Sequence, residues 1–251
     1  MARIERIYRY PVKGLSAEPL AAVSVAQGEG LPLDRMFALA RPETAFEPAR
    51  PAWLAKRHFL MLMRDERLAE LETAYDHASR RLRIARAGRA VLDADTGSEA
   101  GRASIERFFA AFMADSLPAL PRLVQAPGHM FTDNPTPYVS LINLATVREI
   151  GAKLGRCLDP LRFRANLYVD DLAPWAEFDW LGKELAAGEV RFACAERLDR
   201  CAATNVDPAT GARDLNIPLA LRQTWGHIDC GVLLAVRRGG RLEPGQAIGP
   251  A

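Results

Sequence analysis

Arg200-Cys201-Ala202-Ala203-Thr204-Asn205-Val206-Asp207-Pro208-Ala209-Thr210-Gly211 is a polar, turn-forming segment late in the chain that carries a single thiol. A cysteine acts as a nucleophile or as a ligand for soft metals only as the thiolate, and an arginine directly before Cys201 lowers the cost of that ionisation. Pro208 presets one backbone dihedral and Gly211 is free to take a positive φ, so we expect a tight turn that holds the thiol rigidly. The alternative is that Cys201, beside two alanines, is a small buried hydrophobic residue.

Length and composition place the chain among globular proteins that need no covalent cross-links. Its 251 residues suffice for one large domain or two modest ones. The four cysteines are far apart and include no C-x-x-C pair, so neither a disulfide framework nor structural zinc is expected. Lysine and arginine number 33 against 31 acidic residues, without a long basic run, which argues against a nucleic-acid partner. The charged start and the lack of an apolar run of about 18 residues predict a soluble cytoplasmic protein with no membrane partner.

Short strands punctuated by glycine and proline dominate the expected secondary structure. Alternation of apolar and charged residues predicts a strand over residues 3–12 and a hairpin turned near residues 77–79. Apolar residues at helical spacing predict one helix after Ser98 or Ser104 and another after Asn143, a good N-cap residue. This mixture predicts a mainly β fold with a few helices (α+β) and barrel-like sheets.

Residues 163–169 have the pattern of a strand with Arg164 and Asn166 on the same side. A guanidinium and an amide that project together suit recognition of an oxyanion such as phosphate. A solvent-facing edge strand is the alternative, and periodicity does not separate the two. After the Cys201 segment, we expect a polar, proline-bearing connection through Trp225.

Five separated segments, taken together, resemble a known family. They are Tyr10-Pro11-Val12-Lys13-Gly14, Leu33-Asp34-Arg35, Phe163-Arg164-Ala165-Asn166-Leu167, Asp179-Trp180-Leu181-Gly182 and the Cys201 segment. They resemble MOSC-domain proteins with the N-terminal MOSC β-barrel domain, which include the mitochondrial amidoxime-reducing component and the C-terminal region of molybdenum cofactor sulfurase. The resemblance implies a barrel-like N-terminal domain over residues 1–118 and a MOSC domain over residues 119–251.

The resemblance also implies a molybdenum-pterin cofactor (Mo-molybdopterin) between the two halves, with Cys201 as the catalytic residue and the molybdenum ligand. Thiolate is a soft ligand suited to such a metal, and basic side chains neutralise the terminal phosphate of the pterin. Similarity assigns cofactor binding to Lys13, Arg35, Thr136, Arg164, Asn166, Arg200, Thr204 and Asp207. Two positions depart from the family pattern: Gly14 stands where the reductases commonly have serine, and Pro135 where a hydroxyl residue is frequent.

The activity that this resemblance implies is the reduction of N-hydroxylated or other N-oxygenated small molecules. Electrons would come from a separate donor protein, of ferredoxin or cytochrome type with its reductase, because too few cysteines besides Cys201 are present for a four-thiolate cluster. An alternative is a carrier of sulfur or cofactor that uses a persulfide on Cys201. A third hypothesis is a non-catalytic module whose arginines bind another phosphate ligand.

Overall fold

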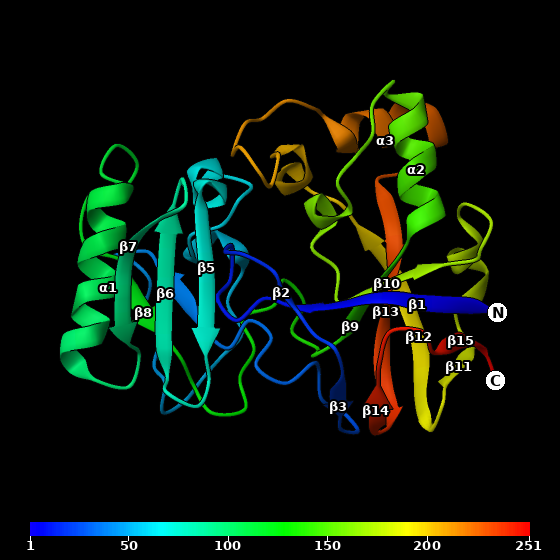
Figure 1. Cartoon of the computed structure of the whole chain (residues 1–251), viewed down its shortest axis with the longest axis horizontal. Coiled ribbons are helices and arrows are strands. Elements are labelled where there is room, and N and C mark those ends of the chain that lie inside the picture. The colour runs from blue at the N-terminus through cyan, green and yellow to red at the C-terminus, as the bar shows by residue number, and fades with distance from the viewer.

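Seven strands close into a β-barrel in the computed structural model, which describes residues 1–251 (Figure 1). Around the barrel each strand hydrogen-bonds to the next, and the last returns to the first. In this order the strands are β1 (Ala2–Arg9), β10 (Leu167–Asp170), β9 (Val139–Asn143), β13 (Asp229–Arg238), β12 (Val190–Asp199), β11 (Glu184–Ala187) and β15 (Ala247–Pro250). The prediction of a mixed, mainly β fold with a few helices is confirmed.

The first strand of the chain closes the barrel that the C-terminal half builds. β1 pairs antiparallel with β10 on one side and with β15 on the other. Ile4 and Ile7 are buried while Glu5 is exposed. A register shift between Ile4 and Arg6 breaks strict alternation and turns Ile7 inward. These side chains join a core cluster of 21 buried apolar residues that β1 shares with the other barrel strands.

Two helices, α2 (Leu144–Lys153) and α3 (Ile217–Trp225), lie on one side of the barrel (Figure 1). Asn143 caps α2 as predicted, because its side chain accepts a hydrogen bond from the Ala145 N–H at 2.9 Å. α3 shows that the predicted polar connection was wrong. Pro218 falls in the first turn of α3, where the helix needs no backbone N–H donor, so it does not prevent helix formation.

Apart from β1 and the short strand that pairs with it, the N-terminal half forms smaller sheets around a separate core of 19 buried apolar residues. Its largest sheet is antiparallel and comprises β5 (Leu71–Asp76), β6 (Arg81–Arg86) and β7 (Arg89–Asp95), beside α1 (Glu99–Phe112). Ser98 caps α1 by accepting from the Gly101 N–H at 3.1 Å, and the β5–β6 turn spans the predicted residues 77–79. The backbone pairing in this half forms sheets of three and two strands and no closed ring.

Three short ladders complete the fold. They pair β2 (Glu18–Pro19) with β1, β3 (Val23–Val25) with β14 (Gly240–Leu242), and β4 (Ala38–Ala40) with β8 (Arg122–Val124). The second and third ladders, like β1, connect residues on both sides of position 118, so the division into residues 1–118 and 119–251 stays a prediction. None of the helices is long and apolar enough to span a lipid bilayer.

Candidate functional site

A pocket of about 450 Å³ lies where the two halves of the chain meet. Residues 13–63 supply one wall and residues 132–233 supply the other. Eight of the nine site residues predicted from the sequence line it, and Asp207 does not. The lining contains seven lysine and arginine side chains against three acidic ones, so the pocket favours an anionic ligand.

Cys201 is the single cysteine that lines the pocket, and it is partly exposed there. It directly precedes a short 3-10 helix, η5 (Ala202–Asn205), and its carbonyl accepts from the Thr204 hydroxyl at 2.9 Å. Thr204 therefore fixes the backbone that presents the thiol. Burial raises the pKa of Cys194 to about 11 and that of Cys230 to about 12, so neither of these thiols is poised to ionise.

The Arg200 side chain is buried and turns toward the backbone, not toward the neighbouring thiol. Its Nη1 donates to the Phe163 carbonyl at 2.7 Å, and its Nε donates to the Cys230 carbonyl at 2.8 Å. Gly231 leaves space beside the guanidinium. A Cβ at this position would lie 3.2 Å from Arg200 Nη2 and 2.2 Å from the Leu141 carbonyl oxygen. Arg200 thus joins the Cys201 turn to β13.

Asp207 closes the turn that follows Cys201, as the Pro208 and Gly211 pattern predicted. One of its carboxylate oxygens accepts from the Ala209 and Thr210 N–H groups, at 2.9 and 3.0 Å. The other accepts from Arg162 Nη2 at 2.7 Å. Although burial opposes it, these bonds and the Arg162 charge lower the pKa of Asp207. Its contacts make Asp207 a support of the thiol-bearing turn.

Arg35 and Arg164 pack against the same buried aromatic ring. Their guanidinium carbons lie 4.5 and 4.3 Å from the centroid of Tyr10, and Arg35 Nη2 donates to the Arg164 carbonyl at 3.0 Å. Both residues have a left-handed backbone, with φ of 48° and 51°. Such conformations are costly for non-glycine residues and are concentrated at functional sites.

The surroundings of the two guanidinium groups differ. Arg35 is paired with the buried carboxylate of Asp34, which, against the effect of burial, raises the pKa of Arg35. The Arg164 guanidinium makes neither an ion pair nor a hydrogen bond with the protein, and burial lowers its pKa. Arg164 is therefore a cation at the pocket wall with its donors unused.

The backbone around Arg164 differs from the predicted strand. Residues Pro160–Phe163 form a 3-10 helix, η3, and β10 begins only at Leu167. Asp159 caps η3 by accepting from the Leu161 N–H at 2.8 Å. Arg164 ends η3 in the left-handed conformation, so it does not share a strand face with Asn166.

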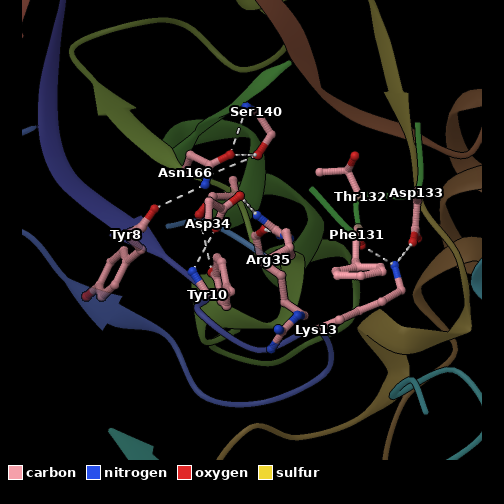
Figure 2. A network of polar contacts seen from close by, with 12 residues as sticks. Tyr8, Tyr10, Lys13, Asp34, Arg35, Phe131, Thr132, Asp133, Ser140 and Asn166 are labelled. Carbon is pink, nitrogen blue, oxygen red and sulfur yellow. Dashed lines mark hydrogen bonds and ion pairs between the residues drawn. The ribbon is translucent and has the colours of Figure 1, made fainter. Parts of the chain in front are cut away.

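Asn166 is buried at the back of the pocket, where it holds together two barrel strands (Figure 2). Its side-chain oxygen accepts from the Ser140 hydroxyl at 2.8 Å, and its amide donates to the Tyr8 carbonyl at 3.1 Å. Thr136, by contrast, is exposed at the pocket rim, and its N–H donates to the Asn134 side chain at 2.9 Å. The Thr136 hydroxyl makes no hydrogen bond with the protein and is free for a ligand.

Lys13 is a buried lysine that reaches across the junction of the two halves (Figure 2). It pairs with the Asp133 carboxylate and donates to the Phe131 carbonyl at 2.9 Å. Burial lowers the pKa of Lys13, and Asp133 partly offsets this. The adjacent Gly14 has a φ of +83°, so a serine there would strain the backbone, and this departure from the family pattern suits the local conformation.

Lys56 is a pocket residue that the sequence reasoning missed. It lies in a short 3-10 helix, η1 (Lys56–His58), with its Nζ 3.5 Å from Asp133. Burial alone would lower the pKa of Lys56, but the Asp133 carboxylate and the Cys201 sulfur together raise it. Lys56 and Cys201 thus line the same pocket, where the ammonium adds to the positive charge that faces a ligand. The basic run Lys56-Arg57-His58 was the available signal.

A metal at Cys201 could not be held by protein ligands alone. No group of three or more His, Cys, Asp and Glu side chains is arranged to bind a metal ion anywhere in the structure. A metal would have to arrive with most of its ligands already attached. The lone pocket thiol, the unused donors of Arg164 and the cationic lining fit a metal bound to an anionic organic carrier, such as a phosphorylated pterin.

Comparisons with known proteins agree with the sequence-based family assignment. The MOSC domain matches residues 129–249, and the MOSC N-terminal beta barrel domain matches residues 1–115. Mitochondrial amidoxime-reducing component 1 of Danio rerio is 28% identical over 118 residues, which are 44% of this chain. The match spans only 36% of the length of that relative.

Two solved bacterial structures are also similar. The YuaD protein from Bacillus subtilis is 14% identical with a TM-score of 0.47, over 98% of this chain and 93% of that one. YiiM from Geobacillus stearothermophilus is 21% identical with a TM-score of 0.36, over 45% of this chain and 53% of that one. With both domain matches side by side along its length, the chain belongs to the family of MOSC-domain proteins that carry the MOSC N-terminal β-barrel domain.

Proposed function

We propose that this protein binds a molybdenum-pterin cofactor in the pocket and reduces N-oxygenated small molecules. One observation carries the proposal: the pocket combines a single accessible thiol with an excess of cations, among them Arg164 with no protein partner. A thiol alone would suit many chemistries, and cations alone would suit any phosphate. The combination suits a ligand that has a soft metal at one end and a phosphate at the other.

Each pocket residue has a distinct part in this proposal. Cys201 supplies the one protein ligand to the metal, and Lys56 stabilises negative charge on its sulfur. Arg164 donates to the terminal phosphate, while Arg35 and Lys13 add positive charge from the N-terminal half. When bound, the cofactor supplies the two-electron chemistry that removes oxygen from an N–O group.

We infer that the electrons come from a separate donor protein. The relative from Danio rerio is named a reducing component, which supports a division of labour between proteins. The site in this chain would then have to accept both a substrate and electrons from outside. The identity of the donor, of ferredoxin or cytochrome type, is part of the same proposal.

The test is metal and pterin content after production in a host that makes molybdopterin. We expect about one molybdenum and one pterin per chain, and loss of molybdenum in Cys201→Ala. Cys157→Ala is the matched control, because Cys157 is an exposed cysteine outside the pocket. Stoichiometric molybdenum in Cys201→Ala would contradict the ligand assignment. Metal-loaded protein that reduces no amidoxime or hydroxylamine when reduced methyl viologen supplies the electrons would contradict the reaction.

The carrier function is a second candidate because Cys201 is partly exposed and lies beside the Lys56 ammonium. An accessible thiol in a cation-lined pocket would also suit a persulfide. Mass spectrometry of the native protein separates the two. A sulfane sulfur on Cys201 without molybdenum favours the carrier, whereas molybdenum with an unmodified Cys201 favours the reductase.

A further inference from the structure

The segment that carries Cys201 continues beyond the pocket and docks on the N-terminal half. Val206 is 2% exposed and belongs to the apolar core of that half. Gly211 has a φ of +74°, and a Cβ there would lie 3.2 Å from Glu70 Cγ, so the turn rests against the short 3-10 helix η2 (Glu66–Glu70). In Figure 1 the yellow-to-orange segment reaches from the barrel side toward the cyan elements.

Arg213 completes this contact with four hydrogen bonds. Its Nη1 donates to the Ala202 carbonyl at 3.2 Å, one residue beyond the pocket cysteine. Its Nη2 donates to the carbonyls of Leu62 and Met63 at 3.1 and 2.7 Å, and to the Glu66 carboxylate at 3.0 Å. Leu62 and Met63 line the pocket from the N-terminal side. One side chain therefore bridges the two walls.

We propose that Arg213 is a positioning residue that clamps the N-terminal wall of the pocket against the Cys201 turn and so limits access to the thiol. The planar guanidinium is needed, because a single ammonium cannot reach acceptors on both walls with the same fixed fork of donors. The inference goes beyond the proposed function, since the clamp shapes the pocket whichever ligand enters it. It assigns a role to a residue that lies outside the pocket lining.

The rate at which iodoacetamide alkylates Cys201 tests the clamp without any cofactor. The protein is made in a host that produces no pterin cofactor, in a Cys157→Ser background that removes the other exposed thiol. We expect Arg213→Ala to raise the alkylation rate of Cys201 about tenfold. This corresponds to a decrease of about 1.4 kcal/mol in the free energy needed to expose the thiol. Arg213→Lys should give a smaller rise. Arg148→Ala is the matched control, because Arg148 pairs with Asp170 on the surface.

Labelling of the buried Cys230 distinguishes local opening from unfolding. The clamp is supported if Cys201 becomes reactive while Cys230 stays unlabelled in the same sample. It is overturned if the Cys201 rate stays within about twofold of the background, or if both thiols become reactive together. If Arg213→Ala does not fold, Arg213→Lys carries the test, and an unchanged Cys201 rate in that variant would equally overturn the clamp.

Discussion

Arg200 and Arg164 line the same pocket, but the barrel surrounds one guanidinium with acceptors and leaves the other without any. Behind the Cys201 turn, the Arg200 guanidinium donates hydrogen bonds to the carbonyls of Cys230 and Phe163. At the end of η3, Arg164 packs on Tyr10 and offers its donors to the pocket. A buried cation whose three nitrogens all have hydrogen-bond partners maintains the fold, whereas one with unpaired nitrogens is available to a ligand. The presence or absence of protein acceptors therefore distinguishes Arg200, which supports the fold, from Arg164, which can bind a ligand.

Arg200→Met should cause the largest loss of stability, because it keeps an apolar side chain but removes every hydrogen-bond donor of the guanidinium. The buried carbonyls of Cys230 and Phe163 would lose their partners, so we expect a loss of about 3 kcal/mol in the free energy of unfolding. Urea unfolding followed by circular dichroism measures it. Arg148→Met, which removes an exposed ion pair, should change stability by less than about 1 kcal/mol. Similar losses in the two variants would refute the supporting role of Arg200.

Arg164→Met should show the opposite behaviour. With only the packing on Tyr10 weakened, we expect stability to fall by less than about 1 kcal/mol. Binding of inorganic pyrophosphate, measured by calorimetry, should weaken about tenfold, because a charge-assisted hydrogen bond to phosphate is lost. Arg148→Met again serves as the control. Unchanged pyrophosphate binding in Arg164→Met would remove the basis for the phosphate assignment.

The sequence could identify the elements but not the partners of these two arginines. Helix caps such as Ser98 and Asn143 act within a few residues, so local patterns were enough to predict them. The acceptors of Arg200 come from residues 163 and 230, and no local pattern reports contacts across such separations. The family resemblance brought the pocket residues together where periodicity could not.

The wrong prediction of a strand at Arg164 could have been avoided from the local sequence. Asp159-Pro160 is a helix-start signal, with a capping carboxylate and a proline at the first position. That signal indicates a short helix before Arg164 in place of the predicted strand. The docking contact of Arg213 had no such signal, because its partners lie in another half of the chain.

Glu177 extends the comparison to a buried anion that is paired only with neutral groups. It accepts from Asn143 Nδ2 at 3.0 Å and from the Thr146 hydroxyl at 2.9 Å, with no cation in contact. Burial raises the pKa of Glu177 more than these hydrogen bonds lower it. A carboxyl with a raised folded pKa stabilises the fold below its unfolded pKa, and this contribution is lost as pH rises through the folded value.

We therefore expect Glu177→Gln to change the pH dependence of stability more than its absolute value. The difference in unfolding free energy, variant minus wild type, should increase as the pH rises above the ordinary range of a glutamate. Urea unfolding at a series of pH values measures this difference, which should stay smaller than the effect of Arg200→Met. A difference that stays constant with pH would show that Glu177 is ionised in the fold without penalty.

The smallest effect is expected at Lys56, whose charge acts on a neighbouring sulfur without holding any backbone in place. Lys56→Met should slow alkylation of Cys201 about threefold in the Cys157→Ser background, because a nearby cation favours the reactive thiolate. Lys153→Met, a matched loss of charge at the end of α2, should leave the rate unchanged. Salt should reduce the difference between Lys56→Met and the background, since screening weakens the attraction between ammonium and thiolate. If Lys56→Met and the background are alkylated at the same rate at low salt, Lys56 interacts with Asp133 but not with the sulfur. In that case Lys56 lines the pocket without affecting the charge on the thiol.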